Sequence, residues 1–312
     1  MGEVKKSSPE KIPLELVLKN SPSWISEHAK EINDLGKRSH WQNPYFSAEW
    51  LLSWWKRLEG NKRPVILVVQ GNDDILLGLW PFVEKDGLLK CKGLWPYVYD
   101  EANYFHPLAE KVAIPVLMDG LQRLLKEYTF AWVPLMRNAF WEEFLQRKVS
   151  NENFFKITRI PRMTSLIEPS TKRFEDFWNE KMGGKTRKSF RYDQRSLSDR
   201  GEVTFEFWED FKDIRSMMPS TCLVEVESRK SKEGVGLYSV RGKRAFFFEL
   251  LPELAKAGRI RLSIMRVDEQ PIAWQLDLLG RDYLAVHHLS FDENWKKYSP
   301  GRQLLRMNLE RA

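Results

Sequence analysis

The segment Tyr298-Ser299-Pro300-Gly301-Arg302-Gln303 combines residue types that can hold a phosphate group. Serine is favoured at a helix N-cap and proline at the first helical position, so Ser299-Pro300 predicts the start of a helix. Gly301 has no side chain and would let a ligand approach the backbone. Because the amides and the positive dipole end of such a helix attract anions, we expect these six residues to bind a pyrophosphate.

Arg302 falls in the first turn of the predicted helix. A cation at that position opposes the helix dipole, and a bound phosphate would offset the cost. An ordinary capped helix with a solvated arginine is the alternative.

His287, His288 and Asp292 are candidate proton acceptors just before this helix. The alternation of residues 282–289 predicts a strand, so the adjacent histidines are expected to face opposite sides, and only one would reach a cleft. A histidine of near-neutral pKa can accept a proton from an attacking amine or hydroxyl. Asp292 is either a second candidate base or a turn former. Histidines that are merely strand residues are the alternative to a catalytic pair.

Residues 181–200 carry an excess of positive charge. Lys188, Arg191 and Arg195 recur at spacings of three and four, which places them on one helical face. Together with Arg187, they are expected to bind an anionic acceptor, such as a tRNA backbone or a glycan-linked phosphate. A solvated basic face is the alternative.

The elements that would position these groups occur twice along the chain. In the first half, Ser47 is expected to cap a helix over residues 48–58, and a hairpin follows at 65–70 and 75–80. In the second half, a helix over 242–258, with Gly258 as its C-cap, precedes a hairpin at 262–267 and 271–278. The same order in both halves predicts two related α/β domains, residues 1–160 and 161–312.

Further elements complete this outline. Strands are expected at 130–134 and 203–208, a helix at 140–147, a crossing segment at 165–169, and helices over 174–200 with an interruption at Gly183-Gly184. The last helix carries an apolar stripe of Leu305, Leu309 and Ala312 and stops without a C-cap. We therefore expect the second domain to be cut short at its C-terminus.

The composition narrows the class of protein. The 312 residues contain 50 Lys and Arg against 43 Asp and Glu, a net charge of +7 that gives a modest bias toward anionic ligands. The two cysteines, Cys91 and Cys222, show no metal-ligand spacing and suit a reducing cytoplasm. No stretch approaches the roughly 18 apolar residues of a membrane span, so we expect no span and no metal.

The run 284–292, followed by 298–305, resembles the GNAT-type acetyltransferases of the cellulose-biosynthesis (CelD/BcsL) group, which are related to the FemAB-like aminoacyltransferases. The likeness also includes residues 43–50, both hairpins and the basic helix near 185–188. It implies tandem GNAT-like domains, each a mixed, mainly antiparallel sheet flanked by helices, with the acyl-CoA site in the second. In that fold the acyl thioester enters a gap beside the strand before the phosphate-binding helix, so the strand at 282–289 would line the acyl group.

The resemblance implies transfer of an acetyl or similar acyl group from acetyl-CoA to a hydroxyl or amine, such as one on a polysaccharide or its precursor. A second hypothesis is FemAB-like aminoacyl transfer from tRNA to a peptidoglycan precursor; outside that case nucleic acid is not an expected partner. A third is a non-catalytic module that binds a glycan or nucleic acid through aromatic and basic side chains.

Overall fold

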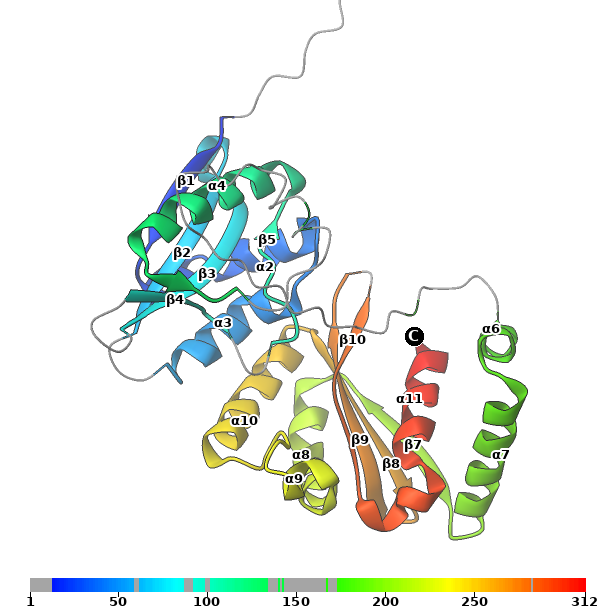
Figure 1. Cartoon of the computed structure of the whole chain (residues 1–312). Coiled ribbons are helices and arrows are strands. Elements are labelled where there is room, and N and C mark those ends of the chain that lie inside the picture. Colours follow the sequence, from blue (N-terminus) through cyan, green and yellow to red (C-terminus); the bar gives the residue numbers. More distant parts are fainter. Residues whose placement is uncertain are drawn as a thin grey trace, which may run out of the picture. The chain divides into compact units, whose positions relative to one another are not determined.

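The computed structural model describes residues 13–58, 62–86, 92–98, 102–133, 140, 142, 167, 173–281 and 283–312. The chain divides into two compact units, residues 1–157 and 158–312. Each unit contains its own sheet with helices packed against it (Figure 1), which confirms the predicted α/β class. The helix expected at 140–147 and the crossing segment expected at 165–169 lie outside the described residues, apart from Phe140, Glu142 and Ile167.

The N-terminal unit is built on a six-stranded sheet of order β1-β2-β3-β4-β6, with β5 paired to β3. Neighbouring strands are antiparallel, except that β4 and β6 are parallel. The strands are β1 (Glu15–Lys19), β2 (Arg63–Gln70), β3 (Leu76–Asp86), β4 (Lys92–Pro96), β5 (Leu108–Ala109) and β6 (Phe130–Ala131). The helices are α1 (Pro22–Glu27), α2 (Ala29–Arg38), α3 (Ala48–Trp55) and α4 (Ile114–Leu124), with 3₁₀ turns η1 (Pro44–Phe46), η2 (Asn72–Asp74), η4 (Lys111–Ala113) and η5 (Leu125–Glu127).

The local signals in the first half predicted its central elements well. The Ser47 hydroxyl accepts a hydrogen bond from the Trp50 amide at 3.3 Å and so starts α3, although the helix ends at Trp55. The predicted hairpin is the β2–β3 pair, and β3 continues to Asp86. The strand expected at 130–134 is limited to the two residues of β6.

The C-terminal unit contains a four-stranded antiparallel sheet of order β10-β9-β8-β7. Its strands are β7 (Val203–Trp208), β8 (Ile260–Val267), β9 (Gln270–Leu279) and β10 (Leu284–Phe291). Its helices are α6 (Phe174–Lys181), α7 (Gly184–Ser198), α8 (Phe211–Glu227), α9 (Arg229–Lys232), α10 (Arg241–Lys256) and α11 (Pro300–Arg311), and η6 (Glu293–Tyr298) leads into α11. All the elements predicted between 174 and 278 are present, and Gly258 has the positive φ of 63° expected after a helix.

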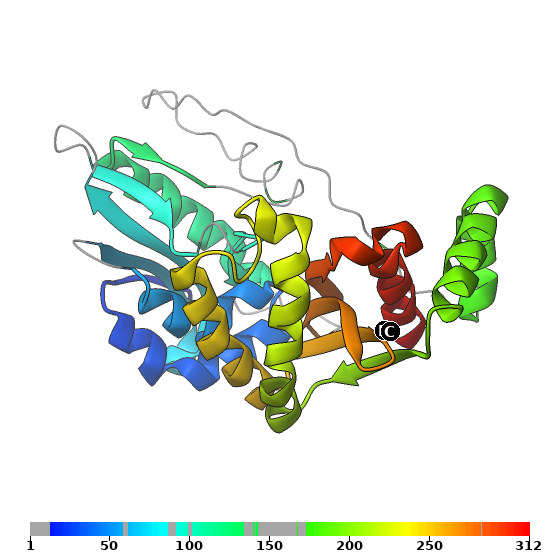
Figure 2. The same cartoon turned by 90° about the horizontal axis from the view of Figure 1, so that it is seen from below.

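Two layers of helices enclose this sheet. Helices α8 and α10 lie on one face and α11 on the other (Figures 1 and 2). The core beneath α11 is formed by Leu304 and Tyr298 together with Met265, Ala273 and Leu197. The unit is therefore a three-layer arrangement in which β10 contacts helices from both sides.

Two features of this unit differ from the sequence prediction. Helix α8 was not predicted, because Pro219 lies inside it and its apolar residues follow no clear helical stripe. The apolar stripe of the last helix is not its main buried face, because Leu305 and Leu309 are half-buried and Ala312 is exposed. The helix instead buries Gly301, Leu304 and Asn308.

Asn308 explains why the apolar pattern does not mark the buried face of α11. Its side-chain oxygen accepts a hydrogen bond from the Ser263 hydroxyl at 2.7 Å, and its amide donates to the Leu304 carbonyl at 3.1 Å. A polar side chain whose hydrogen bonds are satisfied can be buried at little cost, so the buried face of this helix is partly polar.

Replacement of Leu304 by alanine tests this orientation of α11. Leu304 is fully buried, so Leu304→Ala should lower the free energy of unfolding by about 2–5 kcal/mol. Leu305→Ala, at a half-buried neighbour in the same helix, should cost about 1 kcal/mol or less. Urea denaturation of both variants measures the difference, and equal losses would contradict the orientation.

Candidate active site

Strand β10 is the edge strand of the C-terminal sheet within the described part of the chain. Val286 pairs with Asp277 on β9, whereas His288 pairs with the next β9 residue, Leu276. His287 is therefore the extra residue of a β-bulge. Bulges are common beside active sites, where they redirect side chains.

The bulge brings both histidines to the α8–α10 side of the sheet. The His288 ring lies 4.9 Å from that of Trp274, and the His287 ring lies 5.6 Å from that of Phe247 on α10. The prediction that the two histidines face opposite sides is therefore wrong, because the bulge interrupts the alternation on which it rested.

His288 is hydrogen-bonded to Glu225, a residue of α8 that the sequence did not single out. The His288 Nε2 and Glu225 Oε2 atoms are 3.1 Å apart, and both side chains are buried. The indole of Trp274 donates to the same oxygen at 3.1 Å, and the Leu237 amide donates to Oε1 at 2.7 Å. Glu225 is thus a buried carboxylate that accepts three hydrogen bonds.

The electrostatics make this pair a carboxylate and a neutral imidazole. Burial acts to raise the pKa of Glu225, but the hydrogen bond and the attraction from His288, followed by hydrogen bonds from Ser290 and the Leu237 amide, outweigh it and hold the pKa below its usual value. Burial lowers the pKa of His288, and the bond to Glu225 opposes this only in part. Burial, with the nearby His288, Lys243 and Lys230, lowers the pKa of His287 to about 3.

The sequence holds one weak signal for Glu225. The segment Glu225-Val226-Glu227 offers two carboxylates between the predicted strand at 203–208 and the predicted helix at 242–258, but only the helix register separates the buried first from the exposed second. Because helix α8 was not predicted, the sequence did not show which of the two carboxylates is buried.

Asp292 is a turn former in this structure. Its side chain is buried and accepts a hydrogen bond from the Asn294 amide at 2.8 Å, which caps η6. The contacts of Asp292 are thus those of a turn former, and its role as a base stays a prediction.

The predicted phosphate-binding segment forms the turn from η6 into α11. Ser299 has φ 52° and ψ 48°, and its carbonyl, not its hydroxyl, accepts hydrogen bonds from the Arg302 and Gln303 amides at 3.1 and 3.2 Å. The Gln303 side chain donates to the Tyr298 carbonyl at 2.8 Å. Because proline has no N–H, the Gly301 amide is the remaining donor of the first turn.

Gly301 has a packing role that the sequence did not indicate. A Cβ atom at this position would lie 3.1 Å from Phe291 Cδ1 and 3.5 Å from Leu289 Cδ2, both on β10. The missing side chain therefore allows α11 to approach β10. Substitutions of Gly301 disturb this packing in addition to any effect on a ligand.

The positive charge of Arg302 is balanced by a carboxylate of the protein. Its guanidinium lies 2.6 Å from Asp193 on α7, so no phosphate is needed to explain a cation in the first turn. The cations of Arg200 and Lys297 instead lie 5.9 and 4.9 Å from the centre of the Tyr298 ring. Both are next to the turn.

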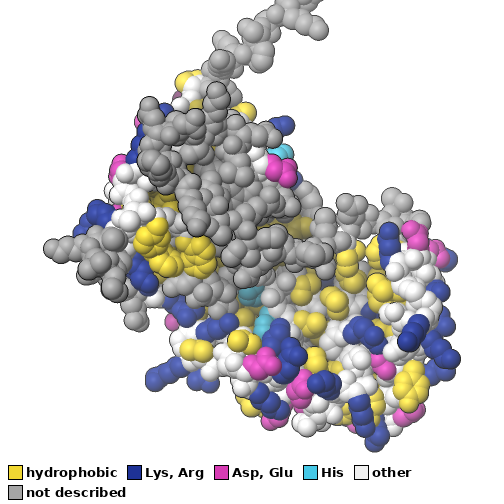
Figure 3. All heavy atoms as spheres, in the orientation of Figure 1, with side chains coloured by type: hydrophobic (Ala, Val, Ile, Leu, Met, Phe, Trp, Pro, Cys, Tyr) yellow, Lys and Arg dark blue, Asp and Glu magenta, His cyan; other side chains and the backbone are white. Residues whose placement is uncertain are grey.

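The basic residues of α7 divide into two groups. Lys188, Arg191 and Arg195 are exposed and form no ion pair or hydrogen bond with the described residues, whereas Arg187 donates to Asn179 on α6 at 2.7 Å. Figure 3 shows Lys and Arg side chains spread over the visible face of the C-terminal unit. The three-residue stripe is therefore available to an anionic partner.

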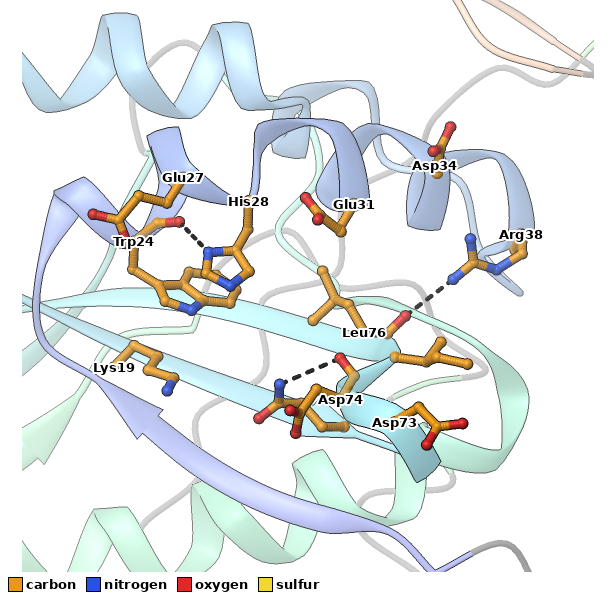
Figure 4. A pocket seen from close by; sticks show the side chains of 12 residues that line it. Lys19, Trp24, Glu27, His28, Glu31, Asp34, Arg38, Asp73, Asp74 and Leu76 are labelled. Atoms are coloured by element: carbon orange, nitrogen blue, oxygen red, sulfur yellow. Dashed lines mark hydrogen bonds between the residues drawn. The ribbon is translucent and has the colours of Figure 1, made fainter.

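A cavity of about 750 Å³ lies in the N-terminal unit, apart from all the predicted site residues (Figure 4). The rings of Trp24 and His28 stack along it, with centroids 4.5 Å apart. Its lining includes five carboxylates, Glu27, Glu31, Asp34, Asp73 and Asp74. This acidic lining disfavours phosphate-bearing ligands such as coenzyme A.

Residues 184–312 match the family model described as an acetyltransferase (GNAT) domain. The C-terminal unit contains a GNAT-type acetyltransferase domain. The strand β10, the turn and the helix α11 all lie within the matched GNAT region. The predicted GNAT resemblance is thereby confirmed for this domain, whereas membership of the cellulose-biosynthesis group stays a prediction.

Similar solved structures cover nearly the whole chain. The crystal structure of FemX has a TM-score of 0.54 at 13% identity, over 95% of this chain and 86% of that chain. A conserved protein of unknown function from Bacteroides thetaiotaomicron has a TM-score of 0.46 at 12% identity, over 94% and 86%. A tandem GNAT protein from the clavulanic acid biosynthesis pathway has a TM-score of 0.38 at 11% identity, over 95% and 85%. No protein of curated function matches the chain.

The FemX similarity extends the fold beyond the GNAT region to the N-terminal unit. With two sheets, each flanked by helices, it confirms the predicted tandem GNAT-like architecture. Among the described residues, no group of three or more His, Cys, Asp or Glu side chains could hold a metal ion. None of the described helices is long and apolar enough to cross a bilayer.

Asp277 gives this domain a pH-dependent stability. Burial raises the pKa of its carboxyl to about 7, although Gln275 donates a hydrogen bond to it and Arg261 lies nearby. A pKa raised on folding means that the stability contributed by the protonated form is present below the unfolded pKa and is lost as the pH rises toward 7.

Asp277→Asn should remove this loss. At pH 8 the variant should be more stable than the wild type by about 2–4 kcal/mol, and at pH 4 the two should be equal. Urea denaturation at both pH values measures this difference. A variant that is no more stable than the wild type at pH 8 would show that burial does not raise the pKa of the Asp277 carboxyl.

Proposed function

We propose that this chain is an acyltransferase that moves an acetyl or similar acyl group from coenzyme A to a hydroxyl or amine acceptor. The observation that carries the proposal is the GNAT-type domain match over β10, an edge strand within the described residues, which leads through η6 and the turn at Ser299 into the N-terminus of α11. Acetyl-CoA is the proposed donor, and the cytoplasm, where that donor is available, is the proposed location.

The donor phosphates are proposed to bind at the turn formed by residues 298–303. The positive end of the α11 dipole and the Gly301 amide favour an anion there. Arg200 and Lys297, beside Tyr298, add two cations that Arg302 does not supply, because its guanidinium is paired with Asp193. Arg302 would contribute by fixing α7 beside the site.

The chemical step is direct attack of the acceptor on the thioester carbonyl. His288 is the base that we favour, since its neutral ring can accept the acceptor's proton. His287 is a weaker proton acceptor, because its pKa is about 3. The stripe of Lys188, Arg191 and Arg195 is the proposed site for an anionic acceptor, such as a polysaccharide precursor that carries phosphate.

Calorimetric titration with acetyl-CoA tests the proposed donor site. The double variant Arg200→Ala/Lys297→Ala should weaken binding at least tenfold, because each charged hydrogen bond to a phosphate contributes about 1.5–3 kcal/mol. Lys232→Ala/Lys256→Ala, which removes the same charge from exposed positions of α9 and α10, is the matched control and should bind normally. Absence of binding by the wild type would contradict the proposal.

Aminoacyl transfer from tRNA is a second candidate function, because Lys188, Arg191 and Arg195 are exposed and have no ion pair or hydrogen bond to the described residues. Under that hypothesis the wild type binds tRNA with a strong salt dependence. Replacing Lys188, Arg191 and Arg195 by alanine should reduce the slope of log affinity against log salt by about 2–3.

The matched control removes Arg229, Lys232 and Lys256 and should keep the wild-type slope. Filter binding with bulk tRNA between low and high salt measures both. If the stripe variant keeps the wild-type slope, the stripe does not bind RNA.

A further inference from the structure

Glu225 is buried at a point where only a carboxylate satisfies its neighbours. Three donors reach its two oxygens: the Leu237 amide at Oε1, and the Trp274 indole and His288 Nε2 at Oε2. An ionised carboxylate accepts hydrogen bonds and donates none, so it fits all three. A glutamine would place its NH₂ group against a donor in either orientation of the amide.

The surrounding chain makes room for this carboxylate. A Cβ atom at Gly236 would lie 2.5 Å from Glu225 Oε1, so a residue with a side chain would displace it. The ammonium of Lys230 on α9 donates to the Leu289 carbonyl of β10 at 2.7 Å. Its charge lies near enough to act on Glu225. The site is thus bonded to β10 at His288 and at the next residue, Leu289.

The arrangement selects one tautomer of His288. Because the ionised Glu225 can only accept, the Nε2 atom of His288 must carry the proton. No hydrogen bond from the described residues involves Nδ1 of His288, which is then the basic nitrogen. A histidine held in this way has its proton-accepting atom already defined before a substrate binds.

We propose that Glu225 is a positioning residue, which holds His288 as the Nε2-protonated tautomer so that Nδ1 accepts the proton of the acyl acceptor. This inference rests on the proposed acyl transfer. The acceptor oxygen or nitrogen forms a bond to the thioester carbonyl carbon, and the carbon–sulfur bond breaks. The acceptor's proton passes to Nδ1 and then to the sulfur of coenzyme A, which leaves as the thiol.

Other charged or titratable groups surround the histidine pair. Those that act on the histidines are Lys230 of α9, Lys243 of α10 and Glu225 of α8, while Cys222 of α8 and Tyr238 of the intervening loop interact with Glu225. Both lysines oppose protonation of His288, and Glu225 favours it. Loss of the Glu225 charge should therefore lower the pKa of His288 further and move any acidic limb of the rate profile to lower pH.

Nitrogen NMR of the full chain, labelled at its five histidines, tests the tautomer directly. The signals of His288 are assigned with a His288→Asn variant. In the wild type near pH 7 we expect a protonated Nε2 and an unprotonated Nδ1, and Glu225→Gln should abolish this pattern. A wild-type ring protonated at Nδ1 alone would overturn the proposal.

Turnover is followed by release of the coenzyme A thiol from acetyl-CoA between pH 5 and 9. Glu225→Gln should slow release by about 10²–10⁴-fold with the affinity for acetyl-CoA changed less than threefold. Asp277→Asn removes an equally buried carboxylate from β9 and is the matched control, expected to remain within threefold of the wild type. Gly236→Ala keeps the Glu225 charge but crowds it, and should slow release if Glu225→Gln does not fold.

The outcomes separate the two proposals. A Glu225→Gln protein that loses the tautomer but releases thiol at the wild-type rate overturns the positioning role. If the wild type neither binds acetyl-CoA nor releases thiol, the proposed function fails, and the spectra alone decide whether Glu225 sets the tautomer of His288.

Discussion

The close approach of α11 to β10 is the constraint on which the C-terminal unit depends. Gly301 favours this approach, because a Cβ atom there would lie 3.1 Å from Phe291 Cδ1 and would need that ring to shift. Once the first turn lies on the strand, Leu304 and Asn308 point into the sheet. Arg302 then forms an ion pair with Asp193 on α7. Arg306 pairs with Glu175 on α6 and packs against aromatic rings of the same helix.

On the opposite face of β10, the structure depends on a balance between the desolvation of Glu225 and the interactions that this carboxylate makes. Burying the carboxylate of Glu225 carries a large desolvation cost, which its three hydrogen bonds and the nearby Lys230 offset. The result is a charged group whose surroundings are fixed by α8, the Leu237 loop and β9 together. A charge held so firmly can control its neighbour His288 without moving during a reaction, which is the requirement of electrostatic preorganisation.

The sequence predicted most of the strands and hairpins, because alternation and turn residues are local properties. It failed where the outcome depends on tertiary contacts. The buried face of α11 includes Asn308, whose burial is made acceptable by Ser263, a residue far away in the chain. Helix α8 contains Pro219 and lacks an apolar stripe, so Glu225 could not be placed opposite His288.

The bulge at His287 shows the same limitation at the candidate site itself. Strict alternation assigns His287 and His288 to opposite faces, and one inserted residue brings both to the face of α8 and α10. The proposed phosphate-binding turn follows β10 after η6 and lies on the α11 side of the sheet, whereas the proposed base lies within β10 and faces α8 and α10. Under the proposed function, a donor held at that turn would reach His288 around the edge of β10 that is unpaired within the described residues, and the bulge lies at that edge. Under the proposed function, the edge of β10, more than either face of the sheet, is therefore where we expect acyl donor and acceptor to meet.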